Sequence, residues 1–202
     1  MHDAQRWLLL ATLALATACG DKPAGEAVPS GPAPDSFKVA FETSKGPIVV
    51  QVNRAWSPLG ADRFYQLTQS RFFDDERFFR VLPHYIAQFG LNDNPKLNEK
   101  WRALPIADDT LRLSNLHGTL SFASEGRNSR SHQLFFNMKD NPSLDSMGFI
   151  PIGRVVSGLA NVDSLYDGYD DTPRQNGIRA RGNKYLAQFP KLDFIRTARV
   201  VP

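Results

Sequence analysis

Short stretches in which apolar and less apolar residues alternate recur along most of the chain after residue 36. Phe37, Val39 and Phe41 form one such stretch, and after a turn at 44–47 the pattern returns over 48–52. Because successive side chains of a strand point to opposite faces, the alternation predicts two half-buried strands joined as a β-hairpin. Further strands are predicted at 119–123, 134–138, 149–156 and 194–201.

Helices are predicted at fewer places. Ser57 followed by Pro58 is typical of a helix N-terminus, and the apolar spacing that follows extends this helix to about residue 70. Residues 158–166 also have helical character, whereas 92–114 are predicted to be mostly loop and 167–183 to form an excursion rich in Gly, Arg and Asn. Strands therefore dominate, and the pattern predicts a mainly β fold: an antiparallel sheet closed into a barrel, with helices over its ends.

The segment 71–90 departs from this pattern in an informative way. It contains two short apolar strands that pivot at Pro83, and each keeps one polar residue, Arg80 or Gln88. An unpaired charge on a buried strand face is costly. These side chains therefore predict a groove in which an apolar ligand meets a few fixed hydrogen-bond donors.

A second strand offers the same combination of residue types. Ile86 and Gln88 are two residues apart and so share one face of their strand, and Gln133 and Phe135 are spaced in the same way. Leu134 and Phe136, which alternate with them, point to the opposite face and are expected to lie in the core. Two strands thus each present an amide and an apolar side chain to a common surface beside the Arg80 guanidinium.

Composition narrows the functional classes. The 202 residues are 42% hydrophobic and 22% charged, which is typical of one globular domain. The 24 basic and 21 acidic residues are interspersed, so nucleic-acid binding is not expected. The histidines are scattered without metal-ligand spacing, so neither a metal nor another cofactor is expected, and a Gly-x-Ser-x-Gly hydrolase elbow is absent from the sequence.

The N-terminal residues predict a targeting signal rather than part of the fold. Residues 1–18 combine a short polar start with an apolar stretch that ends in small residues before Cys19, the single cysteine. This arrangement resembles a bacterial lipoprotein signal in which Cys19 is lipidated, and the alternative is an ordinary signal peptide. Residues 19–36, rich in Pro and Gly, are predicted to be a flexible tether before a domain at 37–202. We expect the domain on the periplasmic side of the cell envelope, with Gly20 favouring an outer-membrane anchor.

Several ordered motifs resemble one known family. The motifs are Phe78–Pro83 with Ile86–Gly90, then Gln133–Phe136, then Leu144-Asp145 with Phe149–Val155. Together they are similar to the cyclophilins, the cyclophilin-type peptidyl-prolyl cis-trans isomerases, over roughly residues 37–202. The resemblance implies a closed eight-stranded antiparallel β-barrel capped by two α-helices, and an enzyme that isomerises X-Pro bonds.

The resemblance also implies residue roles. Arg80 matches the catalytic arginine of the family, and Gln88 would bind the substrate backbone and hold Arg80. The implied substrate-binding residues are Tyr85, Ile86, Ala123, Ser124, Gln133, Phe135, Leu144 and Phe149. Ser143 stands where many eukaryotic members have a Trp that donates to cyclosporin, so weak cyclosporin binding is expected.

The implied chemistry agrees with the properties of these residues. Amide resonance gives X-Pro rotation a barrier of about 18–20 kcal/mol. A donor aimed at the prolyl nitrogen localises its lone pair as the bond twists, which favours the transition state over the ground state. The guanidinium of Arg80 stays charged at all relevant pH values and suits this task.

Two functional interpretations follow. In the first, a lipid-anchored, monomeric isomerase acts on proline-containing polypeptides during the folding of exported proteins. In the second, the same domain is a weakly catalytic module that binds Pro-containing segments or acts as a chaperone. The combination of Arg80 with Gln88, Gln133 and Phe135 favours the enzyme.

Overall fold

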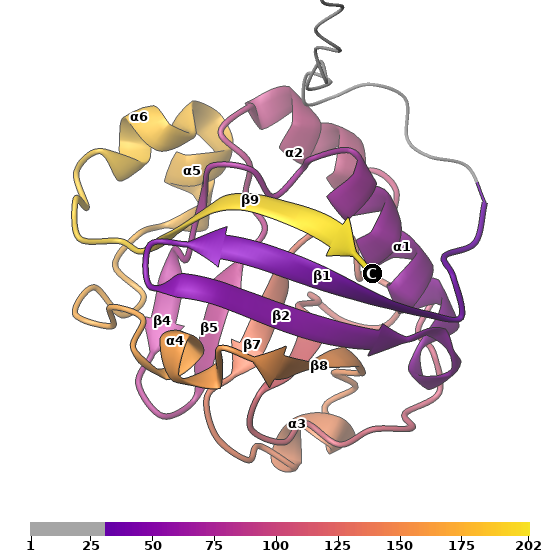
Figure 1. The fold of residues 1–202 in the computed structure, drawn as a ribbon. Helices are drawn as coiled ribbons and strands as arrows, with labels where there is room; N and C mark the ends of the chain where they lie inside the picture. Colours follow the sequence, from indigo (N-terminus) through magenta and orange to yellow (C-terminus); the bar gives the residue numbers. More distant parts are fainter. Residues whose placement is uncertain (1–30) are drawn as a thin grey trace, which may run out of the picture.

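The computed structural model describes residues 31–202, so the predicted leader, Cys19 and most of the predicted tether lie outside the described residues. A nine-stranded antiparallel sheet curls around the core in the order β3-β9-β1-β2-β8-β6-β7-β5-β4 (Figure 1). The strands are β1 (Ser36–Thr43), β2 (Gly46–Asn53), β3 (Glu76–Arg77), β4 (Arg80–Leu82), β5 (Ile86–Phe89), β6 (Thr119–Phe122), β7 (Leu134–Asn137), β8 (Pro151–Ser157) and β9 (Phe194–Val201).

The expected mainly β, antiparallel architecture is confirmed, with two differences in detail. The sheet has nine strands rather than eight, because the short β3 pairs with β9. Strands β3 and β4 are the ends of the strand order, and no pairing among the described strands joins them. The sheet is therefore curled into a half-barrel and is not closed by a continuous hydrogen-bond ladder.

The predicted hairpin forms as expected. Strands β1 and β2 pair with Val39 opposite Val50, and the alternate apolar residues of both strands are buried. Strand β1 begins at Ser36, and Ala33 is already buried, with its backbone N–H donating to Asp62 Oδ1 at 2.8 Å. The chain therefore joins the domain a few residues before the first predicted strand.

More helices form than the sequence predicted. They are the 3₁₀ helix η1 (Arg54–Trp56), α1 (Pro58–Gln69), α2 (Pro95–Arg102), α3 (Ser143–Ser146), α4 (Leu159–Asp163), α5 (Gln175–Arg181) and α6 (Asn183–Leu186). The prediction of loop at 92–114 is wrong for α2. That helix has Pro95 at its first position, and Asn94 Oδ1 accepts a hydrogen bond from the Lys96 N–H at 3.0 Å. Its Trp101 is buried in the core, so packing stabilises a helix that is otherwise polar.

Helix α1 has a different N-terminal partner from the one predicted. The Ser57 side chain does not cap the helix; its hydroxyl donates to Asp109 Oδ2 at 2.5 Å. The Asp109 carboxylate accepts the N–H groups of Leu59 and Gly60 instead, at 3.1 and 3.0 Å. A carboxylate distant in sequence thus satisfies the exposed donors of the helix end.

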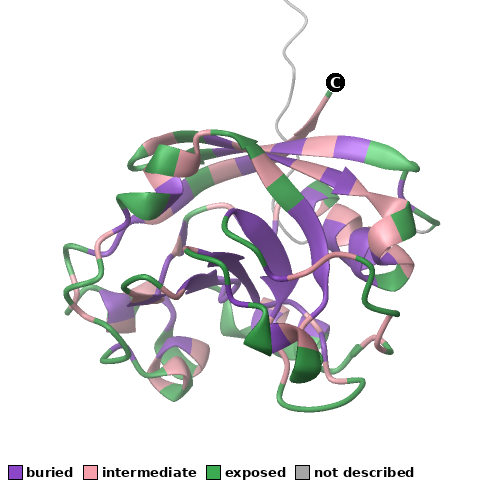
Figure 2. Cartoon of the chain, turned by 90° about the horizontal axis from the view of Figure 1, so that it is seen from below, coloured by how far each residue is buried: buried purple, intermediate pink, exposed green. Residues whose placement is uncertain are grey.

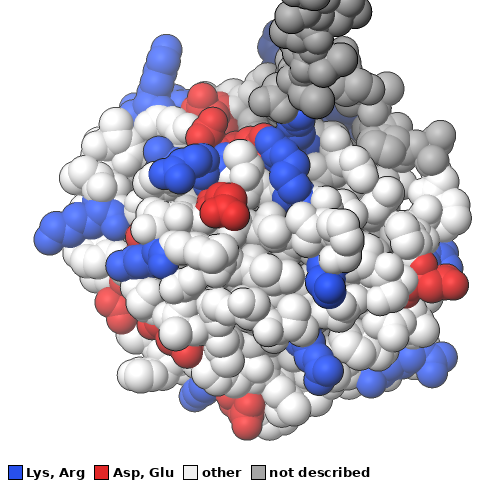
Figure 3. Space-filling view, in the orientation of Figure 1, with Lys and Arg blue, Asp and Glu red and all other residues white. Residues whose placement is uncertain are grey.

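The core is built largely from phenylalanine rings. Phe41 contacts Phe64, Phe73, Phe89 and Phe136, with ring centroids 5.9–6.3 Å apart. Figure 2 shows the buried residues on the strands in the middle of the molecule and the exposed ones mainly on the surrounding loops and helices. Basic and acidic side chains are interspersed on the face seen in Figure 3. Among residues 31–202 no helix combines the length and apolar character needed to cross a membrane.

Candidate functional site

A cavity of about 210 Å³ opens where β4, β5 and β7 lie beside α3. It is lined by Arg80, Tyr85, Ile86, Gln88, Ala123, Ser124, Phe135, Leu144, Met147 and Phe149. Pockets for drug-sized ligands are larger, about 300–1,000 Å³, so this cavity suits a single ring or side chain. The structure thus brings together every residue predicted to act in catalysis or substrate binding except Gln133, which lies directly beside the cavity.

Strand register explains this convergence. Gln88 pairs with Arg80 on one side and with Phe135 on the other. Because directly opposite residues point to the same face, β4, β5 and β7 all direct functional side chains toward the cavity. Leu134 and Phe136 point to the opposite face and are buried in the core, as predicted.

The floor of the cavity is apolar. Ile86, Phe135 and Leu144 form a small buried cluster that is separate from the main core. Phe149 packs edge-on against Phe135, with ring centroids 5.6 Å apart. Tyr85 and Ala123 also line the cavity, and Leu82 packs against the cluster from outside it. Such a surface gains free energy by removing an apolar ring from water.

Partly buried hydrogen bonds hold the segments on either side of this floor. The Asp145 carboxylate, beside Leu144, accepts the Ser114 hydroxyl and the Asn115 side-chain amide. Burial alone would raise the pKa of Asp145, but these hydrogen bonds lower it below the usual value. Asn141 donates to the Tyr85 carbonyl at 2.9 Å. These supporting residues give the loop between β7 and β8 a defined position.

Sequence reasoning missed several of these groups. Met147 lines the cavity, but as an exposed residue in a polar turn it carries no periodic signal. Asn115 lies directly after the stretch that was predicted to be loop, and it also donates to the Phe149 carbonyl at 2.8 Å. A buried asparagine with several partners is recognisable only once the strands around it have been assembled.

A line of polar side chains runs along one edge of the cavity. Arg80 Nη1 donates to Gln88 Oε1 at 3.3 Å, as predicted for a residue that holds Arg80. Gln88 Nε2 in turn donates to Gln133 Oε1 at 2.8 Å. The guanidinium therefore faces the apolar floor with its orientation restricted by a chain of amides.

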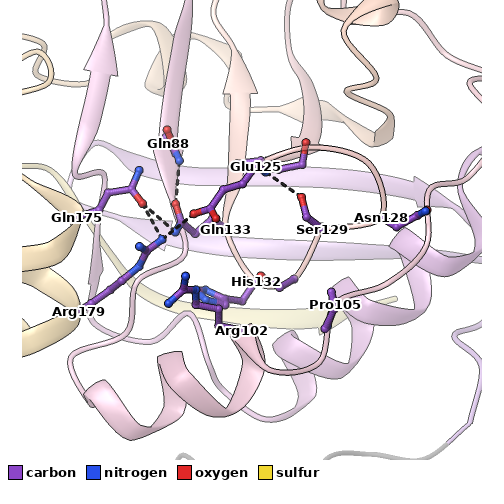
Figure 4. Close-up of a pocket in the computed structure, with 13 residues that line it drawn as sticks. Gln88, Arg102, Pro105, Glu125, Asn128, Ser129, His132, Gln133, Gln175 and Arg179 are labelled. Atoms are coloured by element: carbon purple, nitrogen blue, oxygen red, sulfur yellow. Dashed lines mark hydrogen bonds and ion pairs between the residues drawn. The ribbon is translucent and has the colours of Figure 1, made fainter.

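A second cavity, of about 270 Å³, adjoins the first and shares Gln88, Ala123 and Ser124 with it. Gln133 lines this second cavity, and Figure 4 shows it beside Gln88, with Gln175 and Arg179 of α5 directed toward it. The remaining lining residues include Arg102, Glu125 and His132.

His132 forms a buried boundary of this second cavity. Its Nδ1 lies 2.7 Å from the Gly90 carbonyl oxygen, and its ring packs against Phe72. Burial lowers the pKa of His132 to about 4, and the positive charge of nearby arginines contributes. The imidazole is therefore neutral near pH 7, and its Nδ1–H is the donor to Gly90. Within residues 31–202, no group of three or more His, Cys, Asp or Glu side chains is arranged to hold a metal ion.

The curled antiparallel sheet places the Arg80 guanidinium at the edge of an apolar cavity, and sequence comparison identifies the family to which this arrangement belongs. A family model described as cyclophilin type peptidyl-prolyl cis-trans isomerase/CLD matches residues 38–181. The chain therefore belongs to the cyclophilin-type peptidyl-prolyl cis-trans isomerases and is an enzyme of that class.

Individual proteins of the same family are also similar to this chain. A peptidyl-prolyl cis-trans isomerase of Acinetobacter baylyi is 28% identical over 150 residues, covering 68% of this chain and 79% of the relative. Peptidyl-prolyl cis-trans isomerase A of Dickeya dadantii is 30% identical over 145 residues, covering 68% and 75%. A crystal structure of a Cryptosporidium parvum cyclophilin-type isomerase matches with a TM-score of 0.61 at 17% identity, over 83% of this chain and 98% of the other, and supports the fold.

Proposed function

We propose that Arg80 is the catalytic donor of this isomerase and that the cavity beside it holds the substrate proline ring. One observation carries the proposal: the Arg80 guanidinium lines the apolar cavity formed by Ile86, Phe135 and Leu144. A prolyl ring bound on that floor would place its nitrogen beside a permanently charged donor. Gln88 restrains the guanidinium. The Gln133 amide hydrogen-bonds to Gln88 and Gln175, and its second N–H and second oxygen lone pair would serve the substrate backbone.

Arg80 would accelerate isomerisation by donating a hydrogen bond to the prolyl nitrogen of the substrate. In the planar ground state the prolyl nitrogen lone pair is delocalised and accepts a hydrogen bond poorly. As the bond twists, the nitrogen becomes pyramidal and accepts well, so the interaction with Arg80 strengthens in the transition state. The charge of a guanidinium makes such a hydrogen bond stronger than one from a neutral donor. Bond rotation then needs no covalent step and no proton transfer.

The test compares Arg80→Ala with wild type for cis/trans exchange of a peptide that contains one proline. Removing a preorganised transition-state donor costs roughly 100-fold in rate, so we expect a loss of that order. Arg80→Lys keeps the charge but loses the fork and is expected to recover little. Arg112→Ala, an exposed arginine, is the matched control. Equal exchange by Arg80→Ala and wild type would overturn the assignment.

The same experiment separates the enzyme from the binding module. Peptide titration reports the Kd independently of exchange. If wild type binds the peptide but does not accelerate its exchange above the uncatalysed rate, the chain is a weakly catalytic module that holds Pro-containing segments. The position of Arg80 at the apolar floor favours catalysis.

We also propose that the enzyme acts in the cell envelope on exported polypeptides, anchored by a lipid on Cys19. The support is the sequence of residues 1–36: an apolar signal, small residues before the cysteine, and a Pro- and Gly-rich linker. Mass spectrometry of the mature N-terminus of the full chain tests this. We expect a diacylated Cys19, and Cys19→Ala should release the protein from membranes. A mature N-terminus without lipid would refute the anchor.

A further inference from the structure

The excursion after α4 packs against the segment that carries Arg80. Its Ile178 is fully buried in a second apolar cluster with Phe79 and Leu91. Phe79 directly precedes Arg80 in sequence. The chain neighbour of Arg80 therefore belongs to the apolar cluster that holds α5 in place. In Figure 1, α5 and α6 lie at the same end of the molecule as α2, and α2 contacts α5. The excursion is therefore a packed part of the domain.

Further contacts fix the two ends of α5. Arg174 N–H donates to the Tyr185 hydroxyl at 3.0 Å before the helix. After the helix, Gly182 has φ of 53°, and a Cβ at this position would collide with the Asp93 carbonyl oxygen. Asp93 Oδ1 also accepts the Asn183 N–H at 2.5 Å. With both ends held, the side chains of the excursion have defined positions relative to the groove.

One of these side chains reaches Arg80 itself. Asp171 Oδ1 lies 3.1 Å from Arg80 Nε, while Nη1 of the same guanidinium donates to Gln88. If the 3.3 Å hydrogen bond to Gln88 were the only contact, the planar guanidinium of Arg80 could rotate about it. Two contacts on different nitrogens fix the plane and leave the other N–H groups of the fork for the groove.

A second side chain of the excursion reaches Gln133. Gln133 Nε2 donates to Gln175 Oε1 at 3.1 Å, and the same oxygen accepts Arg179 Nη2 at 3.0 Å. Arg179 thereby orients the Gln175 amide with its oxygen toward Gln133. The Gln133 amide is oriented in turn, because its Nε2 faces Gln175 and its Oε1 faces Gln88.

The result is one continuous polar chain whose two ends both belong to the excursion. It runs from Asp171 to Arg80, Gln88, Gln133 and Gln175. We propose that Asp171 and Gln175 are positioning residues of the isomerase: Asp171 holds the guanidinium plane of Arg80, and Gln175 holds the amide of Gln133. This inference rests on the proposed role of Arg80.

The effect should appear in rate rather than in stability. The Asp171 side chain is 58% exposed, and exposed ion pairs contribute little to folding. Misplacement of a catalytic group lowers the rate of the reaction even where binding is intact. Substrate binding depends mainly on the apolar floor, which the excursion does not form.

The experiment measures the cis/trans interconversion rate of a proline peptide bound at saturation, by exchange NMR, and the Kd by titration. For Asp171→Asn we expect a roughly two- to fivefold slower rate, the range of an exposed ion pair, and for Gln175→Ala roughly two- to tenfold, the range of a neutral hydrogen bond. The Kd should change less than twofold. Asp171→Glu should restore part of the rate.

A spectroscopic signature shows whether Asp171 acts through Arg80. The Nε–H resonance of Arg80 should shift and broaden in Asp171→Asn, because its acceptor is weakened. Matched controls are Asp170→Asn, at a φ of 50° that Asn tolerates, and Asn176→Ala on the exposed side of α5. Neither should change the rate or the Arg80 resonance.

The outcomes separate this inference from the catalytic assignment. If Arg80→Ala loses activity while Asp171→Asn and Gln175→Ala keep the wild-type rate and resonance, the positioning role is refuted and the catalytic role stands. A faster rate in Asp171→Asn would also refute the positioning role, because the Asp171 carboxylate would then be competing with the substrate for the Arg80 guanidinium. If Arg80→Ala remains fully active, the catalytic assignment itself fails.

Discussion

The buried imidazole of His132 makes a quantitative prediction about stability. Its side chain is 1% exposed and lies between Gly90 and Phe72. Burial is the main cause that lowers its pKa from 6.5 to about 4; the charges of Arg179, Arg63 and Arg102 add to this, and the bond to Gly90 opposes it. The folded protein thus takes up this proton far less readily than the unfolded chain does.

The difference between the folded and unfolded pKa of His132 sets how the free energy of unfolding changes with pH. Stability from the neutral imidazole is fully present above pH 6.5 and is lost as pH falls toward and through the folded pKa of about 4. Between pH 7 and pH 5 the unfolded chain binds the proton and the folded state does not. The resulting loss in the free energy of unfolding is roughly 2 kcal/mol.

The assay is urea denaturation at pH 7, 6 and 5 for wild type and His132→Asn. Asparagine keeps a donor near the Nδ1 position but does not titrate. The variant is expected to be less stable at pH 7, because it loses the ring packing against Phe72. Its deficit should then shrink by roughly 2 kcal/mol at pH 5. His84→Asn, an exposed histidine at φ of 54°, controls for removal of an imidazole.

A deficit that stays constant from pH 7 to pH 5 would refute the reasoning. It would mean that His132 takes up its proton equally in the folded and unfolded states. The comparison with the variant is needed because other buried groups also change the pH dependence of wild type. Taking the difference at each pH removes their contribution, provided that they are unaffected by the substitution.

Further predictions concern three other positions. Burial raises the pKa of Glu76 well above its usual value, so its stability contribution is present at low pH and is lost as pH rises through the folded pKa. In urea denaturation, the free energy of unfolding of Glu76→Gln should therefore rise relative to that of wild type as the pH goes from 4.5 to 8. A difference between the two proteins that is the same at both pH values would contradict this. Gly182→Ala should destabilise the domain by roughly 1–3 kcal/mol, because a Cβ there meets the Asp93 carbonyl; a wild-type unfolding midpoint would exclude this strain. Ser143, at the start of α3, should leave cyclosporin inhibition weaker than nanomolar in a peptide isomerisation assay, and nanomolar inhibition would show the prediction to be wrong.

Local patterns were sufficient for the strands and for the faces of the groove. Alternation with period two decides which residues share a face, so the order of residues alone groups Ile86 with Gln88 and Gln133 with Phe135. The motif resemblance added the antiparallel, barrel-like architecture that carries these strands. Helix α2 was missed because its apolar residues are few, and its stability depends on burying Trp101 in the core.

The sequence by itself thus determined the strand-rich fold, the groove residues and the isomerase family, because these depend on local periodicity and on ordered motifs. Tertiary structure alone decided the partners of the groove. Asp171 meets Arg80 across 91 residues, and Gln175 meets Gln133 across 42. Both contacts accompany the packing of Ile178 into the apolar cluster that contains Phe79, and such packing between distant segments has no signature in the order of the residues.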